Sequence, residues 1–258
     1  MFKFQTTDYA KLQTFILQLL NNNSTLLFNY NGNWAHDLTA DIFTRLSCYL
    51  GSSKCLGLAS TSFQQFIGNC QNSAYGTGKC NTIKPDFRLV QFCYGLRQNT
   101  GSANAVQNLV QWYINNAPLA DYWRNDAMAL LNSLSCLTSD TQVEQYLTYA
   151  LNDQFPVEFF QSVGDSDPSG MRLFNYFKKN LATIVNSKHF NRIVSRLALG
   201  WSTANQLSLL QNFDFQGLTL TSDQADAWNN VIMGVQSNMN WLQQNQPVIS
   251  AWLASNVS

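Results

Sequence analysis

Two sets of residues in this 258-residue chain are able to do chemistry, namely two histidines and six cysteines. The histidines, His36 and His189, lie far apart in the sequence, and no H-E-x-x-H occurs anywhere in it. A metallopeptidase of that type needs two histidines one helical turn apart, so that both reach one zinc ion, with the glutamate as general base. We therefore expect no metal ligand in this chain and a surface or interface position for both histidines.

Other catalytic patterns are missing as well. The sequence contains neither a G-x-S-x-G nucleophile elbow nor a phosphate-binding glycine loop. Glu158, Asp165 and Asp167 form a small acidic group whose spacing is too loose for a calcium loop. A Cys–His nucleophilic pair is formally allowed, but disulfides explain the cysteines better. We expect no catalytic residue in this chain and no enzyme activity of the chain itself.

The number of cysteines is even, and their spacing bears on the compartment. No two of them are separated by the two to four residues typical of a zinc site. They fit either disulfides in an exported protein or buried free thiols in a cytosolic one. Three N-glycosylation triplets, which begin at Asn22, Asn23 and Asn256, favour export. We expect an extracellular, cell-surface or secretory-pathway location for a chain with cysteines at Cys48, Cys55, Cys70, Cys80, Cys93 and Cys136.

The composition argues against nucleic-acid and membrane partners. Lysine plus arginine and aspartate plus glutamate number 15 each, so the net charge is zero, and charged residues make up only 12% of the chain. A protein that binds nucleic acid or an anionic membrane carries a basic surface, which this balance does not supply. No apolar run reaches the roughly 18 residues that span a bilayer. The first twenty residues have the pattern of an amphipathic helix, so we expect any export signal to lie outside this sequence.

The elements that must position these residues are expected to be helices. Hydrophobic residues make up 45% of the chain, and apolar stripes with the helical period recur along it, as in Val143, Tyr146, Leu147 and Ala150. We expect an all-α fold of antiparallel helical hairpins stacked into a solenoid-like layer, with one domain over residues 1–258. The expected helices are 9–20, 38–50, 56–67, 87–96, 106–115, 122–134, 143–151, 171–184, 190–197, 205–211, a long helix over 228–242 capped by Thr221 or Ser222, and a separate terminal helix whose first turn holds Pro247.

Four short segments, taken in order over Thr44–Leu253, carry a resemblance. Together they resemble the C-terminal helical domain of the aminopeptidase N-like zinc aminopeptidases, a group that includes endoplasmic-reticulum and insect gut aminopeptidases. The tryptophans of the family's third segment are leucine or phenylalanine here. The family's catalytic and β-domains are absent, so Met1 is compatible with a fragment, an incomplete gene model or a stand-alone relative. The segments are Thr44-Arg45-Leu46-Ser47-Cys48 with Cys55, Phe92-Cys93-Tyr94-Gly95-Leu96-Arg97, Asp167-Pro168-Ser169-Gly170 with Phe177, and Trp241-Leu242 with Trp252-Leu253.

The resemblance also implies how the cysteines pair. By the resemblance, the distant pair is Cys93–Cys136. A disulfide Cys48–Cys55 needs Cα atoms within about 7 Å, whereas a continuous helix would hold them about 10.5 Å apart. That pair therefore requires a turn between the two cysteines, which Gly51 can supply. The remaining pair, Cys70–Cys80, would close the irregular segment Gly68–Pro85.

In the resembled family this domain is a curved HEAT/armadillo-like bowl that closes over the zinc site. The resemblance implies a non-catalytic lid that encloses the active-site cavity and helps to select peptides. Its partners would be the catalytic domain of the same parent and peptide substrates, and zinc is expected only in that absent domain. No motif marks a peptide-contacting residue. The alternative is a free-standing, receptor-like helical module that binds a protein or peptide and has no catalytic partner, and a coding H-E-x-x-H upstream of Met1 would distinguish the two.

Overall fold

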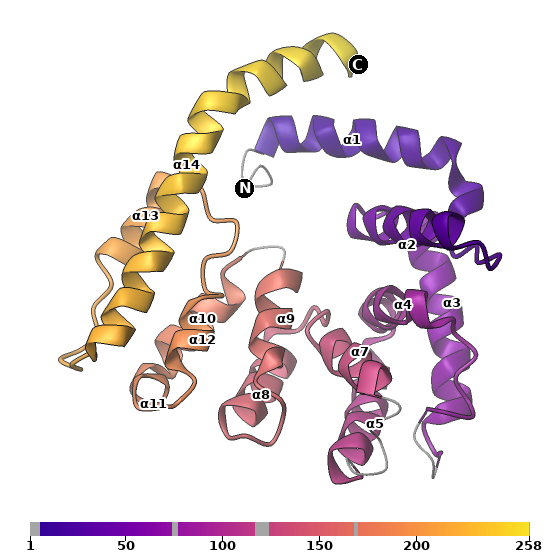
Figure 1. Cartoon of the computed structure of the whole chain (residues 1–258), viewed down its shortest axis with the longest axis horizontal. Coiled ribbons are helices and arrows are strands. Elements are labelled where there is room, and N and C mark those ends of the chain that lie inside the picture. The colour runs from indigo at the N-terminus through magenta and orange to yellow at the C-terminus, as the bar shows by residue number, and fades with distance from the viewer. Residues whose placement is uncertain (1–5, 74–76, 117–123, 168–169, 258) are drawn as a thin grey trace. The chain divides into compact units, whose positions relative to one another are not determined.

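The computed structural model describes residues 6–73, 77–116, 124–167 and 170–257 (Figure 1). Every regular element within these ranges is a helix, which confirms the predicted all-α class. The chain forms two compact units, one made of Leu17–Tyr146 and the other of Met1–Ile16 together with Leu147–Ser258. Each unit is described separately below. The single domain and the curved bowl stay predictions.

The unit Leu17–Tyr146 is built around three helix contacts. Helix α3 packs against α4, α4 packs against α7, and α5 packs against α7. Large apolar side chains such as Phe63, Phe66 and Phe92 are fully buried here. The elements of this unit are the end of α1 (Thr6–Asn22), η2 (Ser24–Leu26), α2 (Trp34–Tyr49), α3 (Ser53–Cys70), α4 (Pro85–Gln98), η3 (Thr100–Ser102), α5 (Ala103–Asn115), α7 (Arg124–Leu134) and the start of α8 (Asp140–Leu151).

Local sequence signals explain where these helices begin and end. The side chain of Asn33 accepts hydrogen bonds from the first backbone N–H groups of α2, and Ser52 caps α3 in the same way. Pro85 stands in the first turn of α4, where its missing N–H costs nothing. Gly51, with a φ of 85°, separates α2 from α3 in a conformation that favours glycine.

Helices α3 and α4 are in close contact at Gly95 of α4. A Cβ atom added at Gly95 would overlap the side chain of Phe63 and lie 2.9 Å from the backbone oxygen of Ala59. Both neighbours belong to α3 and one of them is backbone, so neither can move without shifting the helix. By contrast, a Cβ atom added at Gly57 of α3 meets nothing within 4 Å.

We expect alanine to have opposite effects at these two glycines. Gly95→Ala should lower the free energy of unfolding by about 1–3 kcal/mol, because the added methyl group overfills the contact between the helices. Gly57→Ala should raise it by about 0.5–1 kcal/mol, because alanine restricts the unfolded chain and favours the helix. Urea unfolding followed by circular dichroism measures both changes. Equal effects of the two substitutions would show that α3 and α4 are not in close contact at Gly95.

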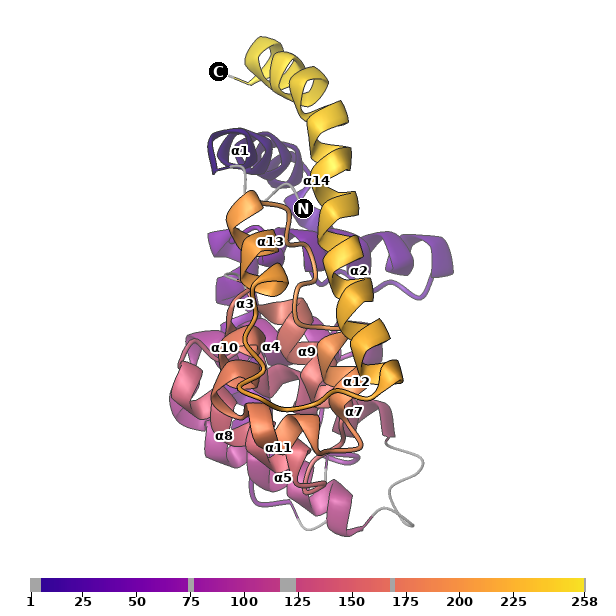
Figure 2. The same cartoon turned by 90° about the vertical axis from the view of Figure 1, so that its left-hand side faces the viewer.

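The other unit contains the end of α8 and the remaining helices. Its longest helix, α14, packs against α12 and α13 (Figures 1 and 2). Trp228 of α14 belongs to an aromatic cluster. Phe177 stacks on Trp228 with ring centroids 5.7 Å apart, and Phe213 contacts both rings. The helices are α9 (Glu158–Ser166), α10 (Arg172–Lys179), α11 (Leu181–Val185), α12 (Phe190–Val194), α13 (Ala204–Gln211) and α14 (Ser222–Asn256).

The structure differs from the sequence-based expectation at Pro247. The sequence predicts that a new helix starts there, but Pro247 lies inside the continuous helix α14. Contacts on both sides of the proline favour continuity, because Gln246 and Ser250 both donate hydrogen bonds to Asp8 of α1, at 3.2 and 2.6 Å. A proline inside a helix bends it, and Figure 1 shows that α14 changes direction towards its C-terminal end.

Two further helices differ from expectation. The segment 171–184 is split into α10 and α11, because Asn180 leaves the helical conformation and its side chain donates a hydrogen bond to the backbone oxygen of Tyr176 at 2.9 Å. Helix α9 had not been predicted. Gly164 near its end is a poor helix former, but a Cβ atom there would lie 3.0 Å from the backbone oxygen of Arg196, so glycine permits a close approach.

Candidate functional site

Neither histidine belongs to a metal site in the part of the chain that the structure describes, where no three His, Cys, Asp or Glu side chains form a group able to hold a metal ion. His36 is half-buried, and its Nδ1 lies 3.2 Å from Oδ1 of the neighbouring Asp37. His189 is only 9% exposed, so it does not lie on the surface, and the alternative interface position stays a prediction. Burial of its ring is compensated by a contact of 2.8 Å between its Nε2 and Oδ1 of Asp153.

Asp153 connects His189 to a lysine. The Nζ atom of Lys188 lies 2.7 Å from Oδ2 of Asp153. Hydrogen bonds from Lys188 and then His189 hold the pKa of Asp153 below its usual value, so this carboxylate stays charged. The cluster is an ion pair on a turn, where Asp153 adopts a φ of 57°. It therefore has the character of a structural contact rather than of an acid–base pair.

The cysteines form three disulfides, and the pairs are those expected from the sequence. Cys48–Cys55 closes the turn at Gly51 with Cα atoms 5.2 Å apart, which is possible because α2 ends before the turn and α3 begins after it. Cys93–Cys136 connects α4 to the segment after α7 with Cα atoms 5.3 Å apart. Cys70–Cys80 joins the end of α3 to the following loop, with Cα atoms 5.4 Å apart.

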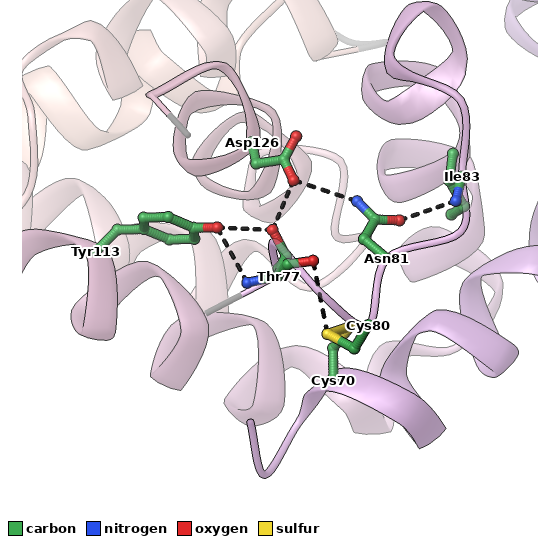
Figure 3. Close-up of a disulfide and its surroundings, with 7 residues drawn as sticks. All are labelled: Cys70, Thr77, Cys80, Asn81, Ile83, Tyr113 and Asp126. Atoms are coloured by element: carbon green, nitrogen blue, oxygen red, sulfur yellow. Dashed lines mark hydrogen bonds between the residues drawn. A yellow bond between two sulfur atoms is a disulfide. The ribbon is translucent and has the colours of Figure 1, made fainter. Parts of the chain in front are cut away.

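A buried polar network lies beside the Cys70–Cys80 disulfide (Figure 3). Thr77 donates its hydroxyl hydrogen to Oδ2 of Asp126 at 2.6 Å, and Asn81 donates to the same oxygen at 3.3 Å. Because the hydrogen of Thr77 is used in this way, its oxygen accepts the hydrogen of the Tyr113 hydroxyl, also at 2.6 Å. Burial raises the pKa of the Tyr113 hydroxyl, which keeps the proton on this donor.

Arg88 supplies the opposite charge in this network. It forms an ion pair with Asp126, whose side chain is 2% exposed, and its Nε donates to the backbone oxygen of Ile83 at 2.9 Å. Asp126 also stands in the first turn of α7, where a negative charge is favoured by the helix dipole. The network thus ties the loop after α3 to α4, α5 and α7, and its groups use one another as partners. We assign it a structural role.

The unit that contains α14 has a pocket of about 490 Å³ that could hold a ligand. Its polar side chains are neutral, and one of them, Asn238, already donates a hydrogen bond to the backbone oxygen of Trp201 at 2.9 Å. A pocket with these properties can accept an uncharged, largely apolar group, and it offers nothing for proton transfer. The lining residues are Ser195, Ala198, Leu199, Gly200, Ala227, Asn230, Val231, Gly234 and Asn238.

Sequence reasoning did not find this pocket. Its two walls come from the segment 195–200 and from one face of α14, and only tertiary packing brings them together. Neither segment carries a motif, and the small residues that make room for the pocket have no distinctive spacing. The polar network beside Cys70–Cys80 was missed for the same reason.

The three asparagines of the glycosylation triplets are all exposed. Asn22 is the last residue of α1 and Asn256 the last residue of α14, while Asn23 follows α1 directly. The Nδ2 atoms of Asn23 and Asn256 donate hydrogen bonds to the backbone oxygens of Leu19 and Trp252. Ser258, which completes the third triplet, lies outside the described residues. Glycosylation at these positions stays a prediction.

Comparison with known proteins identifies the family. A sequence model described as the ERAP1-like C-terminal domain matches residues 1–226, which is most of the chain. The chain belongs to the ERAP1-like C-terminal domain family. This confirms the resemblance to aminopeptidases seen in the sequence.

Relatives of this ERAP1-like domain are much longer proteins. It is 30% identical over 263 aligned residues to "Putative aminopeptidase-2" of Caenorhabditis elegans, and the match covers 99% of this chain but 14% of the relative. It is 22% identical to "Aminopeptidase N" of Canis lupus familiaris, over 81% of this chain and 21% of the relative. It is also 22% identical to "Aminopeptidase Ey" of Gallus gallus, and that match covers 80% of this chain and 21% of the relative. Along the described ranges, none of the helices combines the length and hydrophobicity needed to cross a bilayer.

Proposed function

We propose that this ERAP1-like domain is the non-catalytic lid and regulatory domain of a zinc metallo-aminopeptidase. In this role it helps to enclose the active-site cavity and to select peptide substrates. The observation that carries the proposal is the family match over residues 1–226, together with relatives that are named aminopeptidases and are several times longer. The partner is the catalytic domain of the same parent, and zinc belongs to that domain.

The chemistry of the described residues supports a non-catalytic role. The pocket on α14 is lined by neutral side chains, and the buried carboxylate of Asp126 is paired with the partly buried Arg88. Three disulfides are typical of proteins that fold in an oxidising compartment. We therefore propose an extracellular, cell-surface or secretory-lumen location, with peptides as the ligands that the domain helps to select.

The pocket also favours a second candidate, a free-standing helical module that binds a peptide or protein through an apolar side chain. The two candidates differ in what is encoded upstream of Met1. A coding H-E-x-x-H followed by a second glutamate supports the lid, whereas a complete transcript that starts at Met1 supports the free-standing module. Sequencing of the full-length transcript distinguishes them.

We expect the purified chain to show no aminopeptidase activity on amino-acid chromogenic substrates, with or without added zinc. The reason is that His36 and His189 each contact a single neighbouring carboxylate instead of sharing a metal site. Hydrolysis rates are measured across the monomer peak of a size-exclusion column, with a chelator-treated sample as the control. Zinc-dependent turnover that follows the peak, and that His189→Ala abolishes, would contradict a non-catalytic role.

A further inference from the structure

Helix α2 has an unusual distribution of side chains. Its buried face carries small or polar residues, namely Asp37, Ala40, Thr44, Ser47 and Cys48. Its large apolar residues face outward instead. The exposed fractions of these side chains are 79% for Trp34, 46% for Leu38, 58% for Ile42, 37% for Leu46 and 53% for Tyr49.

The five outward residues lie along one side of the helix, in an arc that also contains Ala35 and Arg45. At 100° per residue, the positions of Trp34, Leu38, Ile42, Leu46 and Tyr49 fall within an arc of about 120° around the helix axis. A stripe of that width is typical of a helix that packs its apolar face against another element. Single exposed apolar residues need no explanation, but a contiguous apolar patch marks an interaction surface. We call these five residues the α2 stripe.

The opposite face of α2 accounts for the attachment of this helix to its own unit. Asp37 accepts hydrogen bonds from the backbone N–H groups of Asn31 and Gly32, both at 3.0 Å, and Thr44 accepts one from the backbone N–H of Phe28 at 3.1 Å. Cys48 is linked to Cys55 of α3. Since these contacts hold the helix from the buried side, the α2 stripe is not needed for them and is available to a partner.

We propose that the α2 stripe packs against an amphipathic helix of the parent polypeptide that precedes this chain. The inference rests on the proposed function, because it needs a longer parent. The matched relatives extend well beyond the aligned region, which is 14% of one relative and 21% of two others. The family is described as a C-terminal domain, so we take the additional sequence to lie before it.

The charges around the stripe favour an apolar helix over an anionic membrane. Arg45 is the one cation among the outward residues of α2, and its Nε donates to both oxygens of Asp41 at 2.8 and 2.9 Å. Binding to an anionic lipid surface depends on several basic residues near the apolar face. A partner helix with its own apolar stripe needs no such charges, since burial of the two stripes supplies the free energy.

The first test compares the solvent accessibility of Trp34 in the parent and in this chain alone. Hydroxyl-radical footprinting with mass spectrometry measures the oxidation rate of its indole. We expect the rate in the parent to be reduced by at least about tenfold, because a side chain that is 79% exposed in the chain alone becomes buried. A rate in the parent equal to that in the isolated chain would overturn the proposal.

The second test replaces Ile42 with glutamate. In the isolated chain, Ile42→Glu should leave the melting temperature unchanged, because the side chain projects into water. In the parent it should lower the melting temperature by several degrees, roughly 2–4 °C or more, because a charge is placed in an apolar contact. The matched control is Leu209→Glu on α13, which replaces another exposed apolar residue (44%) outside the stripe and should behave alike in both proteins.

The outcomes separate this inference from the proposed function. The parent could contain an H-E-x-x-H motif and show peptidase activity, while Trp34 is oxidised as fast as in the isolated chain and Ile42→Glu leaves the melting temperature unchanged. That result would be consistent with the lid role and would overturn the contact of the α2 stripe. The isolated chain could instead form a dimer in analytical ultracentrifugation that Ile42→Glu converts to a monomer. That result would identify a second copy of the chain as the partner of the α2 stripe and would overturn the proposed contact with the parent. A transcript without upstream coding sequence would remove the proposed function and this inference together.

Discussion

Replacement of Asp126 by alanine is expected to lower the free energy of unfolding by about 3–5 kcal/mol. The Asp126 side chain is 2% exposed and is the shared acceptor for Arg88, Thr77 and Asn81. Its removal leaves the guanidinium of Arg88, which is 16% exposed, without its opposite charge in a poorly solvated place. Two polar side chains lose their acceptor at the same time, and buried donors without acceptors are costly.

The matched control is the second aspartate–arginine pair of the same unit. Asp41 and Arg45 are also joined by a charged hydrogen bond, but the Arg45 side chain is 46% exposed and the pair lies on the surface of α2. Asp41→Ala should therefore cost only about 0.3–0.5 kcal/mol. Urea unfolding of both variants, followed by circular dichroism, gives the comparison. If the Asp126→Ala protein were as stable as the Asp41→Ala protein, water would have to enter the network and replace the carboxylate.

The next largest effect is expected for the distant disulfide. Cys93–Cys136 joins residues 43 positions apart, and the loop that it closes contains α5 and α7. In the chain-entropy model a crosslink of that span stabilises by roughly 4 kcal/mol, with measured values of about 2–4 kcal/mol. Cys48–Cys55 spans 7 positions, for which the same model gives roughly 2.5 kcal/mol or less.

We therefore expect the double variant Cys93→Ser with Cys136→Ser to lose more stability than Cys48→Ser with Cys55→Ser. Both variants should still fold, because a chain of 258 residues is held mainly by its buried apolar core. Unfolding midpoints in urea under identical non-reducing conditions provide the measurement. A larger loss for the short loop would mean that packing of α2 against α3 around Gly51 outweighs the entropy of loop closure.

Helix positions were largely predictable from the sequence. Apolar residues at helical spacing indicate a helix with one buried face, regardless of which element of the protein covers that face. The errors occur where a tertiary contact overrides a local preference. Pro247 normally interrupts a helix, but the two contacts to Asp8 favour continuation of α14 across it. Gly164 disfavours a helix locally, yet α9 forms where glycine permits a close approach to Arg196.

The α2 stripe shows the limit of periodicity more directly. Leu38, Ile42 and Leu46 have the spacing of a buried helix face, and the sequence does not reveal whether that face packs inside this chain or against something else. The structure places Ala40 and Thr44 inside and the leucines outside. Small residues permit the close approach of α2 to its neighbours, and this requirement is invisible without the neighbours themselves.

The disulfide pairs were accessible from the sequence, whereas the polar network and the pocket were not. In a disulfide a cysteine pairs only with another cysteine, so few pairings are possible. The turn at Gly51 and the family resemblance together left one set of three disulfide pairs. Asp126 can pair with any nearby donor, and its partners Thr77 and Arg88 come from elements that meet only in the folded protein.

The unit that contains α14 is assembled from both ends of the chain. Phe15 of α1 packs edge-on against Trp252 with ring centroids 5.0 Å apart, and Asp8 accepts a hydrogen bond from Ser250. During synthesis on the ribosome, the first turns of α1 therefore wait for almost the whole chain to emerge before they meet their partner. Residues 17–146 meet no such delay, so the unit Leu17–Tyr146 is able to fold while the unit that contains α14 is still incomplete. We therefore expect the unit Leu17–Tyr146 to fold before the first turns of α1 pack against α14, although α1 comes earlier in the sequence.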